Sequence, residues 1–314
     1  MSVFTPVSRD ELGAFVVDYG LGDLLGFTGI SEGSENSNFF VSLSTGEYVL
    51  TLVERGPEQD LPFFIELLSV LHRAGLPVPY ALPDRNGQAL RHLKGRPALL
   101  QPRLPGRHEL QPGPQHCAQV GQLLARLHLA TCEQIMVRPS DRGWAWIQAE
   151  APAQIAGLPA AQRSLLESAL RELAGQESHL SQLPQANLHA DLFRDNVMFD
   201  GEQLSGVIDF YNACSGPMLY DLAITFNDWC STPAGDIDEA RGQALLNAYA
   251  ALRPFAPQEW PLWPMMLRVA CVRFWLSRAL AVQAHAGQQV LIHDPAEFIA
   301  RLAGRQQPLL ALLP

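Results

Sequence analysis

The chain has 314 residues, of which 47% are hydrophobic and 17% charged, so it can bury a substantial core in one large domain or in two lobes of unequal size. Its formal net charge of −10 argues against a nucleic-acid partner, because phosphate backbones are bound by clustered Lys and Arg. A small-molecule ligand is therefore the expected partner.

The cysteines and the apolar segments exclude further classes of protein. The five cysteines are scattered and never form a Cys-x-x-Cys pair, which argues against a disulfide framework or a structural zinc site. The first ten residues lack the basic start and apolar run of a secretory signal. The longest apolar segment, Trp263 to Val282, is interrupted by arginines, which argues against a membrane span. We therefore expect a cytoplasmic enzyme with no membrane partner.

The first hundred residues are predicted to form strands joined by tight turns, with one inserted helix. Residues 38–43 and 47–54 are rich in β-branched and aromatic residues, and the loop between them ends at Gly46, so they suit a hairpin. From Leu61 to Leu71 the apolar residues recur at helical spacing, which predicts a helix that packs on the sheet.

A second hairpin and a connector are predicted to close this lobe. Residues 89–93 and 96–101 can pair through a turn at Lys94-Gly95, and residues 102–106 are typical of a connector. We place the domain boundary here, with residues 1–103 as an N-terminal nucleotide-binding lobe and residues 104–314 as a C-terminal catalytic and substrate-binding lobe.

Beyond the boundary the pattern is mainly helical. Helical spacing of apolar residues predicts helices over 115–129, around 165–173, and from about Asp221 onward. Short strands are expected at 197–199 and 204–210, joined by a turn at Asp200-Gly201. The predicted fold class is α+β, with a small β-rich N-lobe that carries one packed helix and a larger, mainly helical C-lobe.

The segment His189-Ala-Asp191-Leu-Phe-Arg-Asp-Asn196, followed by Val-Ile-Asp209-Phe, has the side chains that phosphoryl transfer requires. That reaction needs a positioned hydroxyl, a base near its proton, and metal ions that neutralise the phosphates. Asp191 is the candidate base, Asn196 and Asp209 are candidate magnesium ligands, and His189 is expected to support the loop. Each residue alone would suit an ordinary turn, but their order around a hairpin favours a kinase site.

The loop before the first hairpin strand is a candidate phosphate cover. It is rich in Gly, Ser and Asn, and its backbone N–H groups could hold phosphates. It has neither the Gly-Lys-Ser/Thr of a Walker loop nor a G-x-G-x-x-G fingerprint. The predicted nucleotide-binding residues of this lobe are Gly33, Ser34, Asn36, Ser37, Thr51, Gln101 and Arg103.

The arrangement resembles the protein-kinase-like fold, and in particular its aminoglycoside-phosphotransferase and choline-kinase branch, in which an H-x-D-x-x-x-x-N loop is followed by I-D-F. Within that branch it resembles the bacterial homoserine kinases, on the motifs Gly33-Ser-Glu-Asn-Ser-Asn-Phe-Phe40, Leu204-Ser-Gly-Val-Ile-Asp-Phe-Tyr211 and Tyr220-Asp-Leu-Ala-Ile224. The resemblance runs nearly end to end. It implies transfer of the ATP γ-phosphate to L-homoserine in threonine biosynthesis, with ATP and Mg²⁺ as cofactors.

The chain departs from the broader kinase pattern at one position. Kinases of this fold place a phosphate-binding lysine on the strand that corresponds to residues 47–54, but the expected position here is Thr51. The only lysine, Lys94, is predicted to lie in a turn of another hairpin. Arg55 or Arg194 could supply the missing charge, although both could equally be surface residues.

The acceptor site is predicted from charge complementarity, because an amino acid needs a cation for its carboxylate and an acid for its ammonium group. The candidates are Arg278 and Asp228, supported by Tyr211, Asn227 and Trp229. Two alternatives stay open. The chain could phosphorylate another small alcohol, such as choline, ethanolamine or an aminoglycoside, or it could be a non-catalytic nucleotide-binding pseudokinase.

Overall fold

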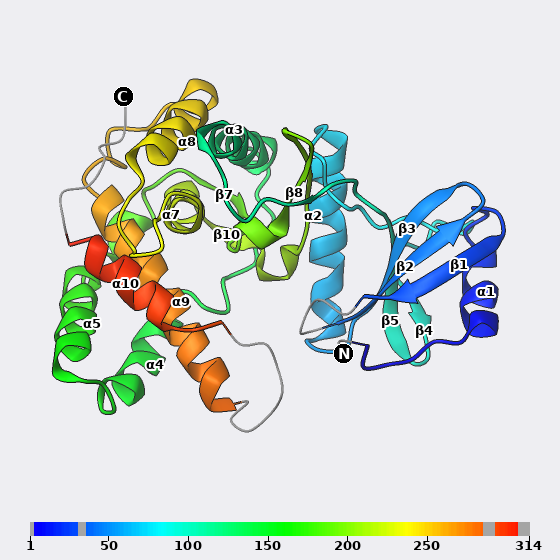
Figure 1. The fold of residues 1–314 in the computed structure, drawn as a ribbon, viewed down its shortest axis with the longest axis horizontal. Coiled ribbons are helices and arrows are strands. Elements are labelled where there is room, and N and C mark those ends of the chain that lie inside the picture. The colour runs from blue at the N-terminus through cyan, green and yellow to red at the C-terminus, as the bar shows by residue number, and fades with distance from the viewer. Residues whose placement is uncertain (1–2, 31–35, 285–292, 307–314) are drawn as a thin grey trace. The chain divides into compact units, whose positions relative to one another are not determined.

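The computed structural model describes residues 3–30, 36–284 and 293–306 of the chain. These residues divide into two compact units (Figure 1). The first unit contains the residues up to Pro105 together with Gly206–Ile208, and the second contains Gly106–Ser205 and the residues from Asp209 onward. This division lies close to the predicted boundary at residue 103, while the function assigned to each lobe remains a prediction.

The first unit is built on a five-stranded antiparallel sheet in the order β1-β2-β3-β5-β4. The strands and helices of this unit are α1 (Arg9–Val17), β1 (Leu24–Gly29), β2 (Ser37–Leu43), β3 (Gly46–Leu52), α2 (Leu61–Arg73), β4 (Arg91–Leu93) and β5 (Arg96–Pro102). The β2–β3 register pairs Leu43 with Gly46 and Asn38 with Thr51. The predicted hairpins and the helix at 61–71 are confirmed.

Helix α1 corrects the expectation of a single helix in this lobe. Ser8 accepts a hydrogen bond from the Glu11 backbone N–H, and the Glu11 carboxylate accepts one from the Ser8 N–H. This reciprocal capping box starts the helix, and its Ser-x-x-Glu signature was present in the sequence. Leu12 and Phe15 of α1 are buried against the apolar side chains of the sheet.

The second unit is mainly helical. Its helices are α3 (Pro114–Thr131), α4 (Trp144–Ile155), α5 (Ala160–Leu173), α6 (Glu177–Leu180), α7 (Met218–Trp229), α8 (Glu239–Leu252), α9 (Trp263–Ala284) and α10 (Ala296–Gly304). Figure 1 shows α9 beside α7 and α10, and these helix pairs are in contact. Within the described residues, no helix is both long enough and apolar enough to cross a membrane.

Short strands hold the functional loop of this unit. Strand β7 (Gln185–Leu188) pairs antiparallel with β10 (Cys214–Pro217). Strand β8 (Val197–Asp200) lies between β6 (Arg107–His108) and β9 (Gln203–Val207). The last two residues of β9 are counted with the first unit. The sequence predicted a strand to residue 210, but β9 ends at Val207, because Asp209 adopts a left-handed backbone conformation with φ 63°.

Candidate active site

The segment from His189 to Asn196 leaves the end of β7 as a loop that is fixed at its start by one carboxylate. The backbone N–H groups of His189 and Ala190 donate to the two oxygens of Asp221, each at 2.8 Å. Ala190 has φ 60°, a conformation that costs free energy in a residue with a Cβ. The paired hydrogen bonds hold this unfavourable turn immediately before Asp191.

Asp221 lies on the first turn of α7 and is fully buried. His128 Nε2 lies 3.1 Å from its Oδ2, and His128 Nδ1 lies 2.8 Å from the Tyr249 hydroxyl. Burial alone would raise the pKa of Asp221, but its hydrogen bonds and the neighbouring histidines outweigh burial and lower the pKa. The charged form of Asp221 is therefore the one that anchors the loop.

Asp191 lies in the middle of this loop, and its side chain is 19% exposed. Asn212 Nδ2 donates to Asp191 Oδ2 at 3.0 Å, and Arg273 Nη1 lies 3.9 Å from Asp191 Oδ1. Burial raises the pKa of Asp191, and the positive charge of Arg273 opposes that shift. An accessible carboxylate with a raised pKa is a suitable proton acceptor.

The two predicted metal ligands have the oxygen donors that Mg²⁺ prefers. Asn196 Nδ2 donates to the Asp191 carbonyl at 2.8 Å, which leaves its amide oxygen available. Asp209 is exposed and stands in a left-handed conformation just after β9. Because β8 and β9 are adjacent strands joined by a short turn, the start of β8 and the end of β9 lie at the same end of the hairpin.

A second cluster of ionic contacts fixes the middle of the loop. Asp228 accepts hydrogen bonds from the Arg194 backbone N–H at 2.8 Å and from its side-chain Nε at 3.1 Å. Arg301 Nη2 also donates to Asp228, at 3.2 Å. Arg194 Nη2 donates to the other oxygen of Asp228 at 3.2 Å, and Nη1 donates to the Leu110 carbonyl at 3.1 Å. Arg194 is thus committed to holding the loop, which argues against its hypothesised role as a substitute for the missing lysine.

Three of the residues predicted to bind the acceptor are instead buried supports of this unit. Trp229 is 0% exposed and donates from Nε1 to the Leu192 carbonyl at 3.0 Å. Asn227 is also 0% exposed, and its amide bonds to the Leu267 carbonyl and to Arg305 Nε. Asp228 is occupied by Arg194 and Arg301 as described above. These contacts argue against acceptor binding by the three residues.

The other two acceptor predictions have different outcomes. Arg278 forms an ion pair with Glu297 and stacks over the Phe298 ring, so its charge is used in the contact between α9 and α10. This contact argues against a substrate role for Arg278. Tyr211 lies next to Asn212 in the short 3-10 turn Phe210–Asn212, and its substrate role stays a prediction.

In the first unit, the described residues of the predicted phosphate cover support a buried carboxylate. The Ser37 hydroxyl donates to Glu54 at 2.6 Å, and the Glu54 backbone N–H donates to Asn36 Oδ1 at 3.1 Å. Ser37 Oγ also accepts from the Phe4 N–H at 2.8 Å. Gly33 and Ser34 lie outside the described residues.

The remaining predicted nucleotide residues lie on or just after the central strands of the same sheet. Thr51 is buried on β3 and donates to Asn38 Oδ1 at 2.7 Å. Gln101 donates from Nε2 to the Pro79 carbonyl at 2.6 Å, and Arg103 lies over the Phe40 ring at 4.0 Å. Their nucleotide contacts stay predictions.

Lys94 is confirmed as a turn residue between β4 and β5. It forms an ion pair with Glu11 of α1 at 2.7 Å, so its charge is already partnered. Arg55, the other hypothesised substitute for the strand lysine, is exposed directly after Glu54.

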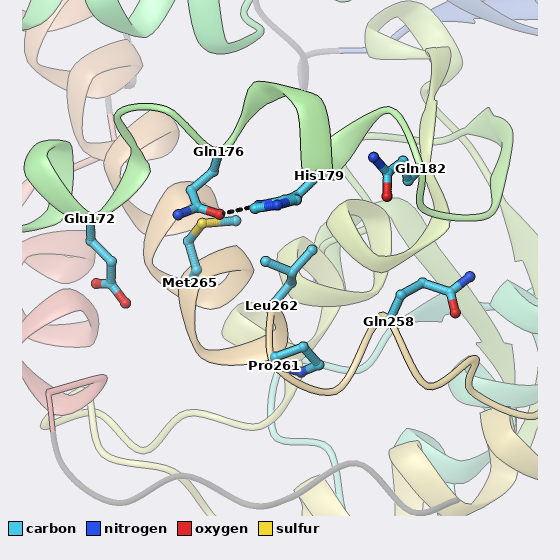
Figure 2. Close-up of a pocket in the computed structure, with 8 residues that line it drawn as sticks. All are labelled: Glu172, Gln176, His179, Gln182, Gln258, Pro261, Leu262 and Met265. Carbon is cyan, nitrogen blue, oxygen red and sulfur yellow. Dashed lines mark hydrogen bonds between the residues drawn. The ribbon is translucent and has the colours of Figure 1, made fainter.

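A surface pocket of about 410 Å³ lies elsewhere in the second unit (Figure 2). It is lined by Glu172, Gln176, His179, Gln182, Gln258, Pro261, Leu262 and Met265, and Figure 2 shows Gln176 and His179 joined by a hydrogen bond. None of the predicted site residues lines it.

Four residues around the loop were not assigned a role from the sequence: His128, Asn212, Asp221 and Arg273. Arg273 was visible as a charge within an apolar segment, which is a signal for a buried functional cation. Asp221 lies in the Tyr220–Ile224 motif of the resemblance, which gave it no role, and His128 and Asn212 carry no local signal that separates them from ordinary helix and turn residues. Their roles follow from contacts between segments that are distant in sequence.

Comparison with known proteins agrees with this geometry. The sequence matches the phosphotransferase enzyme family over residues 26–255. A homoserine kinase of Pseudomonas aeruginosa (strain LESB58) is 65% identical over 306 residues, covering 98% of this chain and 97% of the relative. A homoserine kinase of Burkholderia cenocepacia (strain HI2424) is 42% identical over 310 residues, covering 95% of this chain and 93% of the relative. The chain therefore belongs to the phosphotransferase enzyme family, in the group that contains these homoserine kinases.

Solved structures show the same fold. An amicoumacin kinase in complex with AMP-PNP and Ca²⁺ has a TM-score of 0.69 and 14% identity, covering 96% of this chain and 92% of its own. A spectinomycin phosphotransferase in complex with ADP and spectinomycin has a TM-score of 0.62 and 14% identity, covering 97% and 96%. The predicted α+β, protein-kinase-like fold is confirmed. The family match and the relatives at 65% and 42% identity show that the chain is a kinase.

Proposed function

We propose that this chain transfers the γ-phosphate of ATP to the side-chain hydroxyl of L-homoserine, giving O-phospho-L-homoserine in threonine biosynthesis. The observation that carries the proposal is the 65% identity to a homoserine kinase over 98% of the chain. The placement of Asp191 in an anchored and accessible loop supports it. A cytoplasmic site of action is part of the same proposal.

In this proposal Asp191 is the catalytic base. As the hydroxyl oxygen of the acceptor forms its bond to the γ-phosphorus, the bond from that phosphorus to the ADP oxygen breaks, and the hydroxyl proton passes to the Asp191 carboxylate. Asp221 holds the loop through the His189 and Ala190 N–H groups, and Asp228 holds it through Arg194. These contacts keep the base in place while the acceptor binds.

Asn196 and Asp209 would hold Mg²⁺. When bound, the ion supplies positive charge that offsets the charge on the phosphates. The amide and carboxylate oxygens of these two residues suit Mg²⁺, since this ion is commonly held by one or two protein oxygens together with substrate phosphates.

Two aromatic residues of the second unit do not suit the choline-type alternative. A pocket for a quaternary ammonium needs exposed aromatic faces. Phe226 and Trp229, two of the aromatic residues nearest the motif in sequence, are both 0% exposed.

The test is an ADP-release assay with ATP and Mg²⁺ against L-homoserine, L-serine, choline, ethanolamine and kanamycin. We expect the highest kcat/KM with L-homoserine. Clear activity on another alcohol with none on L-homoserine would overturn the substrate assignment. A lack of ADP release with every acceptor would support the pseudokinase alternative.

A further inference from the structure

Two residues that lie far apart in sequence meet beside the proposed base. Asn212 belongs to the turn after Asp209, and Arg273 belongs to the middle of α9. Asn212 Nδ2 donates to Asp191 Oδ2 at 3.0 Å, and Asn212 Oδ1 accepts from Arg273 Nη2 at 3.3 Å. The amide thus connects the arginine to the carboxylate.

The contact with Arg273 determines which way the Asn212 amide points. A guanidinium group can only donate hydrogen bonds, so it selects the amide oxygen and turns the amide nitrogen toward Asp191. If the amide were flipped, its NH₂ group would face the arginine and its oxygen would face the carboxylate, and both contacts would be repulsive.

Arg273 is itself held firmly. Its side chain is 4% exposed and its guanidinium lies 3.8 Å from the centre of the Phe274 ring. Nη1 has no hydrogen-bond partner among the described residues, and it lies 3.9 Å from Asp191 Oδ1. The guanidinium therefore lies beside Oδ1 without donating a hydrogen bond to it.

We propose that Asn212 is a positioning residue for phosphoryl transfer. Its amide occupies Oδ2 of Asp191 and so presents Oδ1 to the acceptor hydroxyl. Arg273 keeps the Asn212 amide in the required orientation. This inference rests on the proposed role of Asp191 as the base. It assigns a catalytic consequence to two residues outside the His189–Asn196 loop.

The decisive variant is Asn212→Asp. An aspartate keeps an oxygen that accepts from Arg273, so a purely structural role would be preserved. It removes the donor to Asp191 and places a second negative charge against it. We expect kcat to fall by roughly 10- to 100-fold, a substantial part of what a positioned base contributes. The KM values for ATP and for the acceptor should stay within about threefold, since neither substrate contacts this amide in the proposal.

Asn247→Asp is the matched control, because Asn247 is an exposed residue of α8 and undergoes the same change in charge. It should keep wild-type kcat. Melting temperatures of both variants should match the wild type, which separates a kinetic effect from unfolding. Wild-type kcat in Asn212→Asp would overturn the proposal.

Arg273→Lys tests the second step. It keeps a positive charge but not the planar donor fork, so the amide orientation is less well fixed and kcat should fall. In the Asn212→Asp background the same change should add little, because residues that act as one unit have non-additive effects. Fully additive losses would overturn the dependence of Arg273 on Asn212. All variants are assayed with whichever acceptor the wild type turns over, so failure of the homoserine assignment is distinguishable from failure of this inference.

Discussion

Asp191 is subject to two opposing influences, because burial raises its pKa and the charge of Arg273 opposes that rise. Asp191→Asn removes the proton acceptor while its side-chain oxygen can still accept the hydrogen bond from Asn212. We expect kcat to fall by about 10²-fold or more, the usual contribution of a positioned base. The measurement is steady-state ADP release under saturating ATP and acceptor.

Asp195→Asn is the matched control for this prediction. Asp195 is exposed in the same loop and loses the same charge. Its kcat should remain close to the wild-type value. Equal losses in the two variants would show that the charge of the loop, and not the base itself, determines the rate.

Asp221 connects α7 to the catalytic loop, so its effects belong to the scale of whole elements. Its pKa is lowered in the folded chain, and its carboxylate therefore stabilises the fold above the unfolded pKa near 3.9. That stabilisation is lost as the pH falls through the folded pKa. Asp221→Asn should lower the free energy of unfolding at pH 7 by about 2 kcal/mol or more, because buried donors lose their partner.

The same variant should show a shallower loss of stability on acidification below about pH 4, because it lacks the titrating carboxylate. Urea unfolding measured between pH 3 and pH 7 tests both effects. Asp141→Asn, with a side chain that is 79% exposed, is the control and should follow the wild-type curve. An unchanged acid profile in Asp221→Asn would contradict the assignment of a charged anchor.

Helices α3 and α8 meet closely at one glycine. A Cβ at Gly121 would lie 2.3 Å from the backbone oxygen of Leu245. Because this neighbour is backbone, the clash could be relieved only by moving a helix. Gly121→Ala should therefore destabilise the chain by about 1–3 kcal/mol, the typical cost of overpacking. Gly13→Ala on α1 is the matched control, because nothing lies within 4 Å of its new Cβ. Helix propensity should make that control neutral or more stable, and thermal unfolding compares the two.

At the scale of the whole molecule, ligand binding to the folded state should raise the melting temperature by mass action. We expect a larger increase with ATP and Mg²⁺ than with ATP and EDTA. In Asp209→Ala the difference between these two conditions should shrink, since a proposed metal ligand is removed. Asp200→Ala, an exposed acid at the end of β8, should behave as the wild type. An unaltered Mg²⁺ effect in Asp209→Ala would argue against its role.

The sequence predicted the hairpins and helices that depend on local residue patterns. It did not predict the contacts between segments that are distant in sequence. One loop and one hairpin set the spacing of Asp191, Asn196 and Asp209, so the sequence alone could predict that these residues form one motif. Asn227, Asp228 and Trp229 were predicted to bind the acceptor because their polar groups look available in sequence. In the structure these groups bond to residues 34–78 positions away. Such pairings follow from tertiary packing, which no local pattern encodes.

Lys94 is the chain's only lysine, and its side chain is 39% exposed at a turn of the first unit. Apart from the amino terminus, it is therefore the single primary amine that an acylating dye can modify. A fluorophore placed there would report on the β-sheet unit, to which Lys94 belongs. Because nearly all of its positive charge is arginine, the unmodified chain offers one side-chain amine for labelling without any engineered cysteine.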